Sequence, residues 1–306
     1  MNKRNLTGMI GLGAVATLAL AGCTGAGDNG DETGSENPAP AECDTITLGF
    51  LPSWTDGLST AYLLENQLEK LGYTVEMETL TEAGPLYTGL AQGDVDIYPS
   101  AWPELTHAQY MEEFGDSIED LGAYYDNAKL TIAVPSYVDI DSIEDLAGNA
   151  DRFEGRVVGI EPGAGLTAQT QDTMMPEYGI DGEYSLVTSS TAAMLTELEN
   201  AIAAQEDIVV TLWRPFWAND AFDIKDLEDP LGAMGEPEAL HFLGTDGFSE
   251  RCGDAADLIA GIQLDDEQYG SLEDLVVNEY GEGREAEAIE AWLAENPDAF
   301  DTIITN

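Results

Sequence analysis

The chain has 306 residues, 60 acidic and 10 basic side chains, and a formal net charge of −50 at pH 7. So negative a field repels nucleic acid, and no cluster of Lys and Arg in the sequence forms a patch that could overcome it. Carboxylates this numerous indicate a solvated, halophile-like surface rather than a metal store, and with only two histidines the chain has no His cluster that would predict a metal site.

Residues 1–22 are predicted to be a lipoprotein signal peptide. Lys3 and Arg4 precede an apolar run over Met9–Leu20 that is too short for a comfortable membrane span, and the run closes on Leu-Ala-Gly-Cys, ending at Cys23. This pattern is typical of the bacterial lipobox, in which the cysteine becomes the lipidated N-terminus. The alternatives are an ordinary signal peptide with an incidental cysteine, or a single anchor helix.

Residues 23–43 are predicted to be a disordered tether. Thr24–Ala41 is made mostly of Gly, Asp, Glu, Asn and Pro and holds no large apolar residue, so it cannot bury enough surface to offset the entropy of ordering. Together with Cys23, the tether predicts a domain that is lipid-anchored on the extracytoplasmic face of the cell membrane and does not itself cross the bilayer.

From residue 44 onward, strand and helix patterns alternate. The predicted elements are, in chain order, strand Thr45–Phe50, helix Leu58–Leu71, strand Thr74–Leu80, helix Pro85–Ala91, strand Val95–Tyr98, helix Leu105–Phe114, strand Leu130–Val134, helix Ile143–Leu146, strand Val157–Ile160, a helix from Thr167, helix Met194–Ala203, strand Ile208–Leu212, and helices Asp254–Gly261 and Glu285–Glu295. Strands interleaved with helices predict an α/β fold with largely parallel sheets.

The cysteines Cys43 and Cys252 remain after Cys23 is assigned to the lipobox. Outside the cytoplasm an isolated pair is more often a disulfide than two free thiols, so the pair is predicted to be bonded, with free thiols as the alternative. The sequence contains no G-x-S-x-G, P-loop or dinucleotide-binding motif and no catalytic Cys/His pair, so neither an enzyme nor a cofactor is expected.

Six segments together resemble the substrate-binding proteins of glycine betaine and choline ABC transporters, the OpuAC/ProX-like family. They are LENQLEKLGYTV (64–75), LAQGDVD (90–96), AWP (101–103), GIEPGAG (159–165), VTLWRPFW (210–217) and DPLG (229–232). Each segment alone is a weak signal, but they occur in the family's order from about Thr45 to the C-terminus.

The resemblance implies a type II periplasmic-binding fold of two α/β lobes, each a mainly parallel sheet flanked by helices, with the ligand in the cleft between them. The implied divisions are residues 44–131 for the first part of lobe I, 132–213 for lobe II and 214–306 for the second part of lobe I. The chain would cross between the lobes near Leu130–Val134 and again near Trp213–Asp220.

A trimethylammonium group has no N–H to donate, so it is best held against aromatic faces, of which indole is the strongest. Trp54, Trp102 and Trp213 each follow or end a predicted strand, where an α/β sheet presents its cleft. The resemblance implies that Trp102 and Trp213 are walls of a cation cage; for Trp54 a cage role and a core role are equally open. The alternative for all three is ordinary core packing.

Other candidate ligand-binding residues follow from the same resemblance. Asp56 lies where the choline-binding branch uses an acid for the choline hydroxyl. His107 follows Trp102 as a ligand histidine does in some relatives, one position out of register. Tyr125 could complete the cage. The turn before a predicted helix could receive a carboxylate through its backbone, with a plain strand-to-helix turn as the alternative; its residues are Gly163, Ala164, Gly165 and Leu166.

The sequence therefore predicts a lipoprotein that binds glycine betaine or a similar small quaternary amine and delivers it to ABC permease subunits. A choline- or carnitine-specific protein of the same family is the alternative. A surface lipoprotein without a transport role, or an enzyme, is the alternative of another class.

Overall fold

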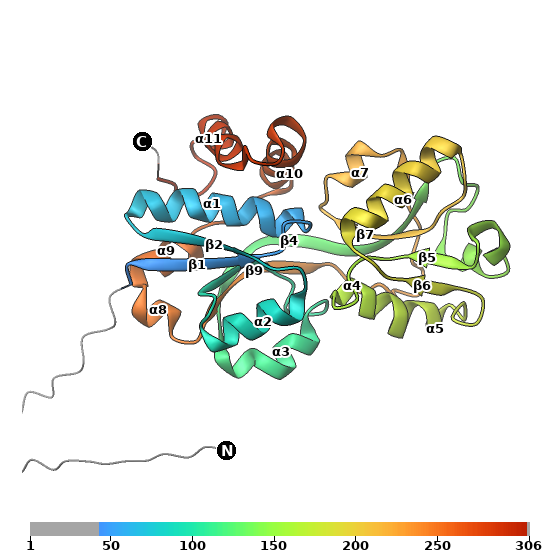
Figure 1. Cartoon of the computed structure of the whole chain (residues 1–306), viewed down its shortest axis with the longest axis horizontal. Coiled ribbons are helices and arrows are strands. Elements are labelled where there is room, and N and C mark those ends of the chain that lie inside the picture. The colour runs from blue at the N-terminus through green and yellow to red at the C-terminus, as the bar shows by residue number, and fades with distance from the viewer. Residues whose placement is uncertain (1–42, 305–306) are drawn as a thin grey trace, which may run out of the picture. The chain divides into compact units, whose positions relative to one another are not determined.

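The computed structural model describes residues 43–304. The predicted signal peptide, the lipobox cysteine and all of the predicted tether except Cys43 lie outside these residues. The long strand β4 (Ile118–Pro135) runs from one sheet into a second and takes part in both (Figure 1).

Sheet A contains the N-terminal strands and the first part of β4. Its order is β2 (Thr74–Thr79), β1 (Thr45–Phe50), β3 (Ile97–Ala101), β9 (Glu238–Thr245) and β4. The first three strands are parallel, and β9 is antiparallel to both β3 and β4. The helices that accompany this sheet are α1 (Thr55–Leu71), α2 (Ala83–Gln92), α3 (Ala108–Phe114), α8 (Phe248–Arg251), α9 (Gly253–Ala260), α10 (Asp266–Asp274) and α11 (Glu285–Glu295).

Sheet B contains the second part of β4 and the middle of the chain. Its strands are β4, β7 (Val210–Arg214), β5 (Arg156–Val158) and β6 (Ser185–Val187) in that order, with β8 (Ile224–Asp226) on the other edge of β4. The accompanying helices are α4 (Gly165–Ala168), α5 (Met175–Glu177), α6 (Thr191–Ala204) and α7 (Ala218–Ala221). A π-helical segment over Gln169–Met174 joins α4 to α5. We name residues 43–128 and 238–304, which carry sheet A, lobe I, and residues 129–237, which carry sheet B, lobe II.

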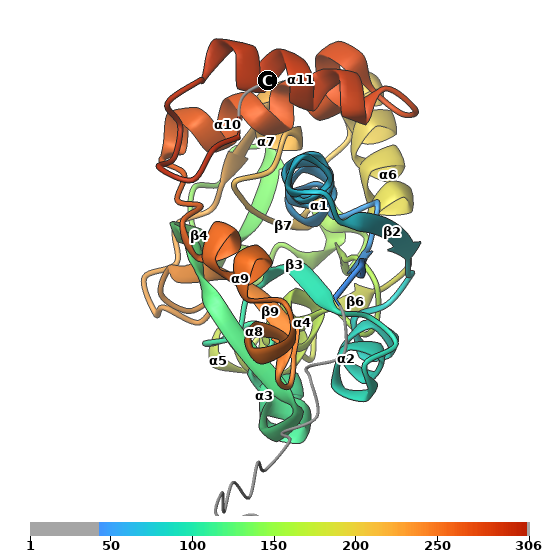
Figure 2. The same cartoon turned by 90° about the vertical axis from the view of Figure 1, so that its left-hand side faces the viewer.

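Helices cover both faces of each sheet, which confirms the predicted α/β architecture. In Figure 1, α1 lies on one face of sheet A and α2 on the other, while α6 and the α4–α5 segment lie on opposite faces of sheet B. Figure 2 shows α10 and α11 stacked beyond α1, and α9 beside β4. The predicted helix Leu58–Leu71 begins three residues earlier, at Thr55, and ends as expected at Gly72, whose φ of 101° suits glycine.

The strand pairings correct the predicted limits between the lobes. Ala128 still pairs with Glu238 in sheet A, whereas Lys129 pairs with Arg214 in sheet B, so the first crossing falls slightly before the predicted segment. The second crossing, predicted near Trp213, comes later because β8 hydrogen-bonds to β4 within sheet B. The chain returns to sheet A only at β9, and residues 214–237 belong with lobe II.

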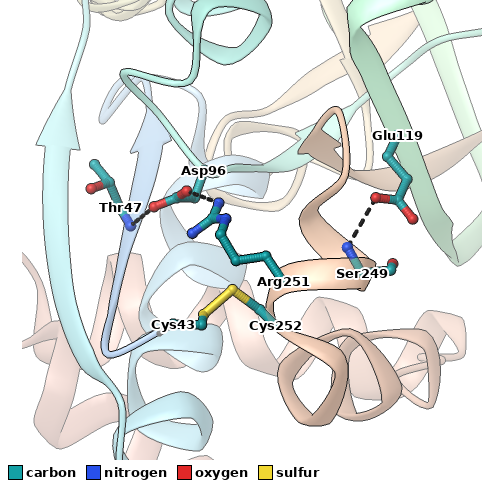
Figure 3. Close-up of a disulfide and its surroundings, with 7 residues drawn as sticks. All are labelled: Cys43, Thr47, Asp96, Glu119, Ser249, Arg251 and Cys252. Carbon is teal, nitrogen blue, oxygen red and sulfur yellow. Dashed lines mark hydrogen bonds and ion pairs between the residues drawn. A yellow bond between two sulfur atoms is a disulfide. The ribbon is translucent and has the colours of Figure 1, made fainter. Parts of the chain in front are cut away.

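A disulfide joins Cys43 to Cys252, the pair left once Cys23 is assigned to the predicted lipobox, and ties the start of β1 to the segment between α8 and α9 (Figure 3). Its Cα–Cα distance is 5.5 Å and it closes a loop with a sequence separation of 209. Beside it Arg251 pairs with Asp96, whose other carboxylate oxygen accepts from the Thr47 amide at 2.8 Å. The disulfide and this ion pair fasten the first strand to the C-terminal part of lobe I.

Removing the disulfide is expected to lower the free energy of unfolding by about 2–5 kcal/mol, because a long loop in the unfolded chain is no longer closed. Denaturant unfolding of wild type and of the variant carrying Cys43→Ser and Cys252→Ser measures the difference. A reducing agent should shift the wild-type midpoint and leave that of the variant unchanged. Two titratable thiols at residues 43 and 252 in the oxidised protein would contradict the assignment.

Candidate functional site

A cavity with an empty volume of about 340 Å³, including its open mouth, lies between the two lobes. Lobe I contributes residues from the start of α1 and from the segment after β3, and lobe II contributes residues from β4, β7 and the turn after β5. The lining residues are Trp54, Asp56, Trp102, Thr106, His107, Leu130, Ile160, Ala164, Gly165, Leu166 and Trp213. Of the ten ligand-site residues that the sequence predicts, the fold brings eight to this one cavity.

Three indoles form the aromatic part of the wall. Trp54 directly precedes α1, Trp102 directly follows β3, and Trp213 lies in β7, so the two lobes each supply part of the aromatic surface. All three are buried. The ring of Trp213 is stacked on that of Phe216, with centroids 3.9 Å apart at 25°, and this packing fixes the orientation of its face. The cavity therefore offers several indole faces to a small ligand.

Asp56 supplies the only carboxylate among the lining residues. Its Oδ2 accepts hydrogen bonds from Trp102 Nε1 at 3.1 Å and from Ser100 Oγ at 2.7 Å. Burial raises the pKa of Asp56, and the two hydrogen bonds oppose that rise. No Lys or Arg lines the cavity, so this carboxylate is free to attract a cationic ligand.

His107 places a neutral hydrogen-bond donor at the cavity. The backbone N–H of Trp102 can only donate, and it lies 3.1 Å from His107 Nδ1, so Nδ1 is an acceptor and the ring proton sits on Nε2. Tyr87 Oη shares Nδ1 at 3.1 Å. Burial lowers the pKa of His107 to about 3, which keeps the imidazole neutral at ordinary pH. Its ring also lies parallel to that of Trp54, at 6.1 Å and 19°.

The start of α1, with Trp54 at its N-cap and Asp56 in its first turn, is held from the side away from the cavity. Thr55 Oγ1 donates to Glu273 Oε1 at 2.6 Å. Glu273 comes from α10, and burial raises its pKa to about 8. This contact anchors the first turn of α1 to α10 of the same lobe and so supports two residues of the cavity wall.

The turn after β5 was predicted to receive a ligand carboxylate, and it is also in direct contact with lobe I. The Gly163 amide donates to Glu82 Oε2 at 3.2 Å, and its carbonyl accepts from Tyr110 Oη at 2.7 Å, so the Gly163 peptide is already engaged by lobe I. Gly163 does not line the cavity, whereas the next three residues of the turn do. A Cβ atom at Gly165 would overlap the carbonyl oxygen of Thr106, so the two lobes meet there backbone to backbone.

Tyr125 is not part of the cavity wall, and its predicted place in the cage is wrong. Its ring packs on Tyr269 with centroids 4.8 Å apart, and its hydroxyl donates to Asp266 Oδ1 at 2.9 Å, because this part of β4 faces α10. The neighbouring Tyr124 is stacked on Phe242 within lobe I.

The sequence did not single out three apolar or small lining residues, Thr106, Leu130 and Ile160. Thr106 is next to His107 in sequence, Leu130 begins a predicted strand and Ile160 ends one, and these positions are the only signal that could have found them. Within residues 43–304, no group of three or more His, Cys, Asp or Glu side chains is arranged to hold a metal ion. None of the helices in the same range is long and apolar enough to cross a membrane.

Two α/β lobes linked by a shared strand, with a small aromatic cavity lined from both, define a solute-binding protein of the type II periplasmic-binding class. The chain belongs to the family described as the substrate binding domain of ABC-type glycine betaine transport systems, whose model matches residues 44–295. This confirms the resemblance found in the sequence. The family is one of transporter components and not a class of enzymes.

Known proteins agree with this assignment. The glycine betaine/carnitine transport binding protein GbuC of Listeria monocytogenes is 34% identical over 161 residues, which is 52% of this chain and 51% of the Listeria protein. The match therefore spans about half of that relative.

Two solved structures share the fold over most of its length. The glycine betaine/L-proline-binding protein ProX of Borrelia burgdorferi has a TM-score of 0.77 and 32% identity, covering 83% of this chain and 94% of that one. Lactococcal OpuAC, in a closed conformation complexed with glycine betaine, has a TM-score of 0.76 and 27% identity, covering 84% and 97%.

Proposed function

We propose that this protein captures a small quaternary-ammonium solute, glycine betaine first among them, between its two lobes and delivers it to the permease subunits of an ABC importer. The observation that carries the proposal is the cavity itself, with three indoles and one carboxylate and with no Lys or Arg in its lining. A cation without N–H groups is held by such faces, each desolvated contact contributing up to about 2 kcal/mol. Micromolar affinity needs about 8 kcal/mol of binding free energy. Three aromatic walls, together with contacts to the other end of the ligand, supply a free energy of this order.

Glycine betaine also has a carboxylate, for which the cavity offers uncharged donors. His107 carries a proton on Nε2, and the first amides of α4, at Gly165 and Leu166, have no partner within their own helix. The amide of Gly163, engaged by Glu82, is not among these donors. We propose that the ligand carboxylate lies between the imidazole and the start of α4, with the trimethylammonium group among the indoles.

Choline is the second candidate, and Asp56 is the observation that favours it. A carboxylate in the lining attracts any cation, accepts a hydrogen bond from a ligand hydroxyl and opposes a ligand carboxylate. The two ligands therefore place opposite demands on one residue, and that residue can be altered.

Asp56→Asn is expected to leave glycine betaine affinity unchanged or improved and to weaken choline about tenfold, or about 1.4 kcal/mol. Asparagine keeps an oxygen that can accept from Trp102 Nε1 and removes the charge. Isothermal titration of both ligands with wild type and variant gives the ratio of the two affinities, in which any general damage to the site cancels. Equal losses for both ligands would mean that Asp56 only holds Trp102 in place.

A thermal-shift screen of the purified protein at high salt tests the function as a whole. Glycine betaine, proline betaine, carnitine, choline and ectoine should be compared, since a ligand at 100 times its Kd stabilises the folded state by about 2.7 kcal/mol. We expect the largest rise in Tm with glycine betaine. A protein that no methylated amine stabilises would contradict the proposal, and turnover of a substrate would favour an enzyme instead.

We also propose that the protein is anchored to the extracytoplasmic face of the membrane through Cys23, which lies outside the described residues. Wild-type protein should fractionate with membranes, and Cys23→Ser should release it or leave its signal peptide uncleaved. A Cys23→Ser protein that is processed and still membrane-bound would show that the anchor is something other than a lipid on this cysteine.

A further inference from the structure

The carboxylate of Glu161 receives hydrogen bonds from both lobes. Glu161 follows β5 in lobe II, where Oε1 accepts from the Thr191 amide at 3.0 Å and Oε2 from Thr191 Oγ1 at 2.9 Å. From lobe I, Trp54 Nε1 donates to Oε2 at 3.1 Å, and Ser53 Oγ lies 3.4 Å from Oε1. Thr191 opens α6, where the helix dipole favours a negative charge. Glu161 is thus held within lobe II by Thr191, and it also accepts a hydrogen bond from Trp54, an indole of the cavity wall in lobe I.

Glu161 is buried but does not line the cavity, so its influence on a ligand passes through Trp54. Within residues 43–304 no Lys, Arg or His forms an ion pair with it. The carboxylate is compensated by hydrogen bonds alone.

A carboxylate that accepts an indole N–H has two effects on the ring. It fixes the ring plane, because charge-assisted hydrogen bonds are short and directional. It also shifts electron density from the N–H onto the face of the indole ring, an effect that is strongest in a low-dielectric site. A more negative ring face attracts a cation more strongly. Trp102 donates to Asp56 in the same way, but Asp56 lines the cavity and can also contact a ligand directly. Glu161 does not line the cavity, so a substitution there tests the effect that passes through the indole alone.

We propose that Glu161 is a positioning residue that couples recognition of the cation to closure of the lobes. Because its carboxylate and the Trp54 indole belong to different lobes, the bond exists only when the lobes are together, and separating them leaves the indole without this hydrogen bond and less polarised. The full cation affinity of the cage is therefore present only in the closed protein. This inference rests on the proposed function.

The test is a double-mutant cycle on the affinity for glycine betaine. Glu161→Gln removes the charge and leaves one accepting oxygen in place of two, so it cannot accept from all the donors that contact Glu161. Trp54→Phe keeps an aromatic face while removing the indole N–H. We expect Glu161→Gln to weaken binding about tenfold in the wild-type background and less than about twofold in the Trp54→Phe background. A role confined to holding α6 through Thr191 would give the same loss in both backgrounds, and that result would overturn the inference.

Glu82→Gln is the matched control, since Glu82 also joins the lobes, through the Gly163 amide, and within residues 43–304 it forms no hydrogen bond with Trp54, Trp102 or Trp213. Its effect should be the same in both Trp54 backgrounds. If Glu161→Gln fails to fold, Glu161→Asp, which keeps the charge and withdraws it from the indole, replaces it with the same expected pattern. A wild type that binds no quaternary ammonium compound contradicts the proposed function; a wild type that binds, with an additive cycle, contradicts only the role of Glu161.

Discussion

Replacing Trp102 or Trp213 with Ala is expected to lower affinity for the quaternary-ammonium ligand by about 30- to 150-fold, or about 2–3 kcal/mol. Each substitution removes an indole face from the cavity, and for Trp213 it also removes the partner stacked on Phe216. Leucine at either position should restore volume without restoring binding, because it supplies apolar area and no quadrupole. Isothermal titration with glycine betaine measures the loss.

A tryptophan far from the cavity provides the control. Trp292 is fully buried on α11, and its Nε1 lies 2.9 Å from Ser271 Oγ and 3.1 Å from the Gln268 carbonyl, to which it donates. Trp292→Phe should lower the Tm of the unliganded protein and leave the Kd of the folded protein unchanged. If Trp102→Ala and Trp213→Ala both bind as the wild type does, the aromatic cage is not the basis of recognition.

Local sequence pattern was enough to predict the elements in which burial and periodicity agree. The strand over Thr45–Phe50 and the helix over Glu285–Glu295 have the predicted bounds, since each has a regular pattern and a clear stop signal. The same reasoning missed β9 and the first half of β4, which are antiparallel partners. The first half of β4 carries several acidic residues and a glycine, and its register is irregular, so no local pattern shows that it is a strand.

Those parts of the candidate site that depend on a particular residue type were predictable from the sequence. Those that depend on contacts between distant segments were not. Tryptophans near strand ends, read together with the family resemblance, indicated the aromatic walls, and the resemblance alone singled out Asp56. Nothing local shows that Tyr125 faces α10, 141 residues away along the chain at Asp266, instead of the cavity. Glu161 was visible only as part of a turn motif, because its partners Trp54 and Thr191 are distant in sequence.

Gly165 is a point of close contact between the two lobes, and its replacement is expected to prevent full closure. A Cβ atom there would overlap the Thr106 carbonyl oxygen. Thr106 has little freedom to retreat, because its amide donates to Glu238 Oε1 at 3.0 Å and the Leu105 amide donates to Glu238 Oε2 at 2.9 Å. Glu238 is itself buried in β9. The extra methyl group can be accommodated only by holding the lobes apart.

Gly165→Ala should therefore weaken glycine betaine binding by about 5- to 150-fold, which corresponds to the about 1–3 kcal/mol cost of overpacking a closed interface. Each lobe keeps its own core, so the Tm without ligand should change little, while small-angle scattering should show less compaction when ligand is added. Gly182→Ala in the same lobe is the control, since a Cβ there meets nothing within 4 Å and should leave both measurements as in wild type. Binding and compaction in Gly165→Ala equal to those of Gly182→Ala would mean that the contact between Gly165 and Thr106 does not limit closure.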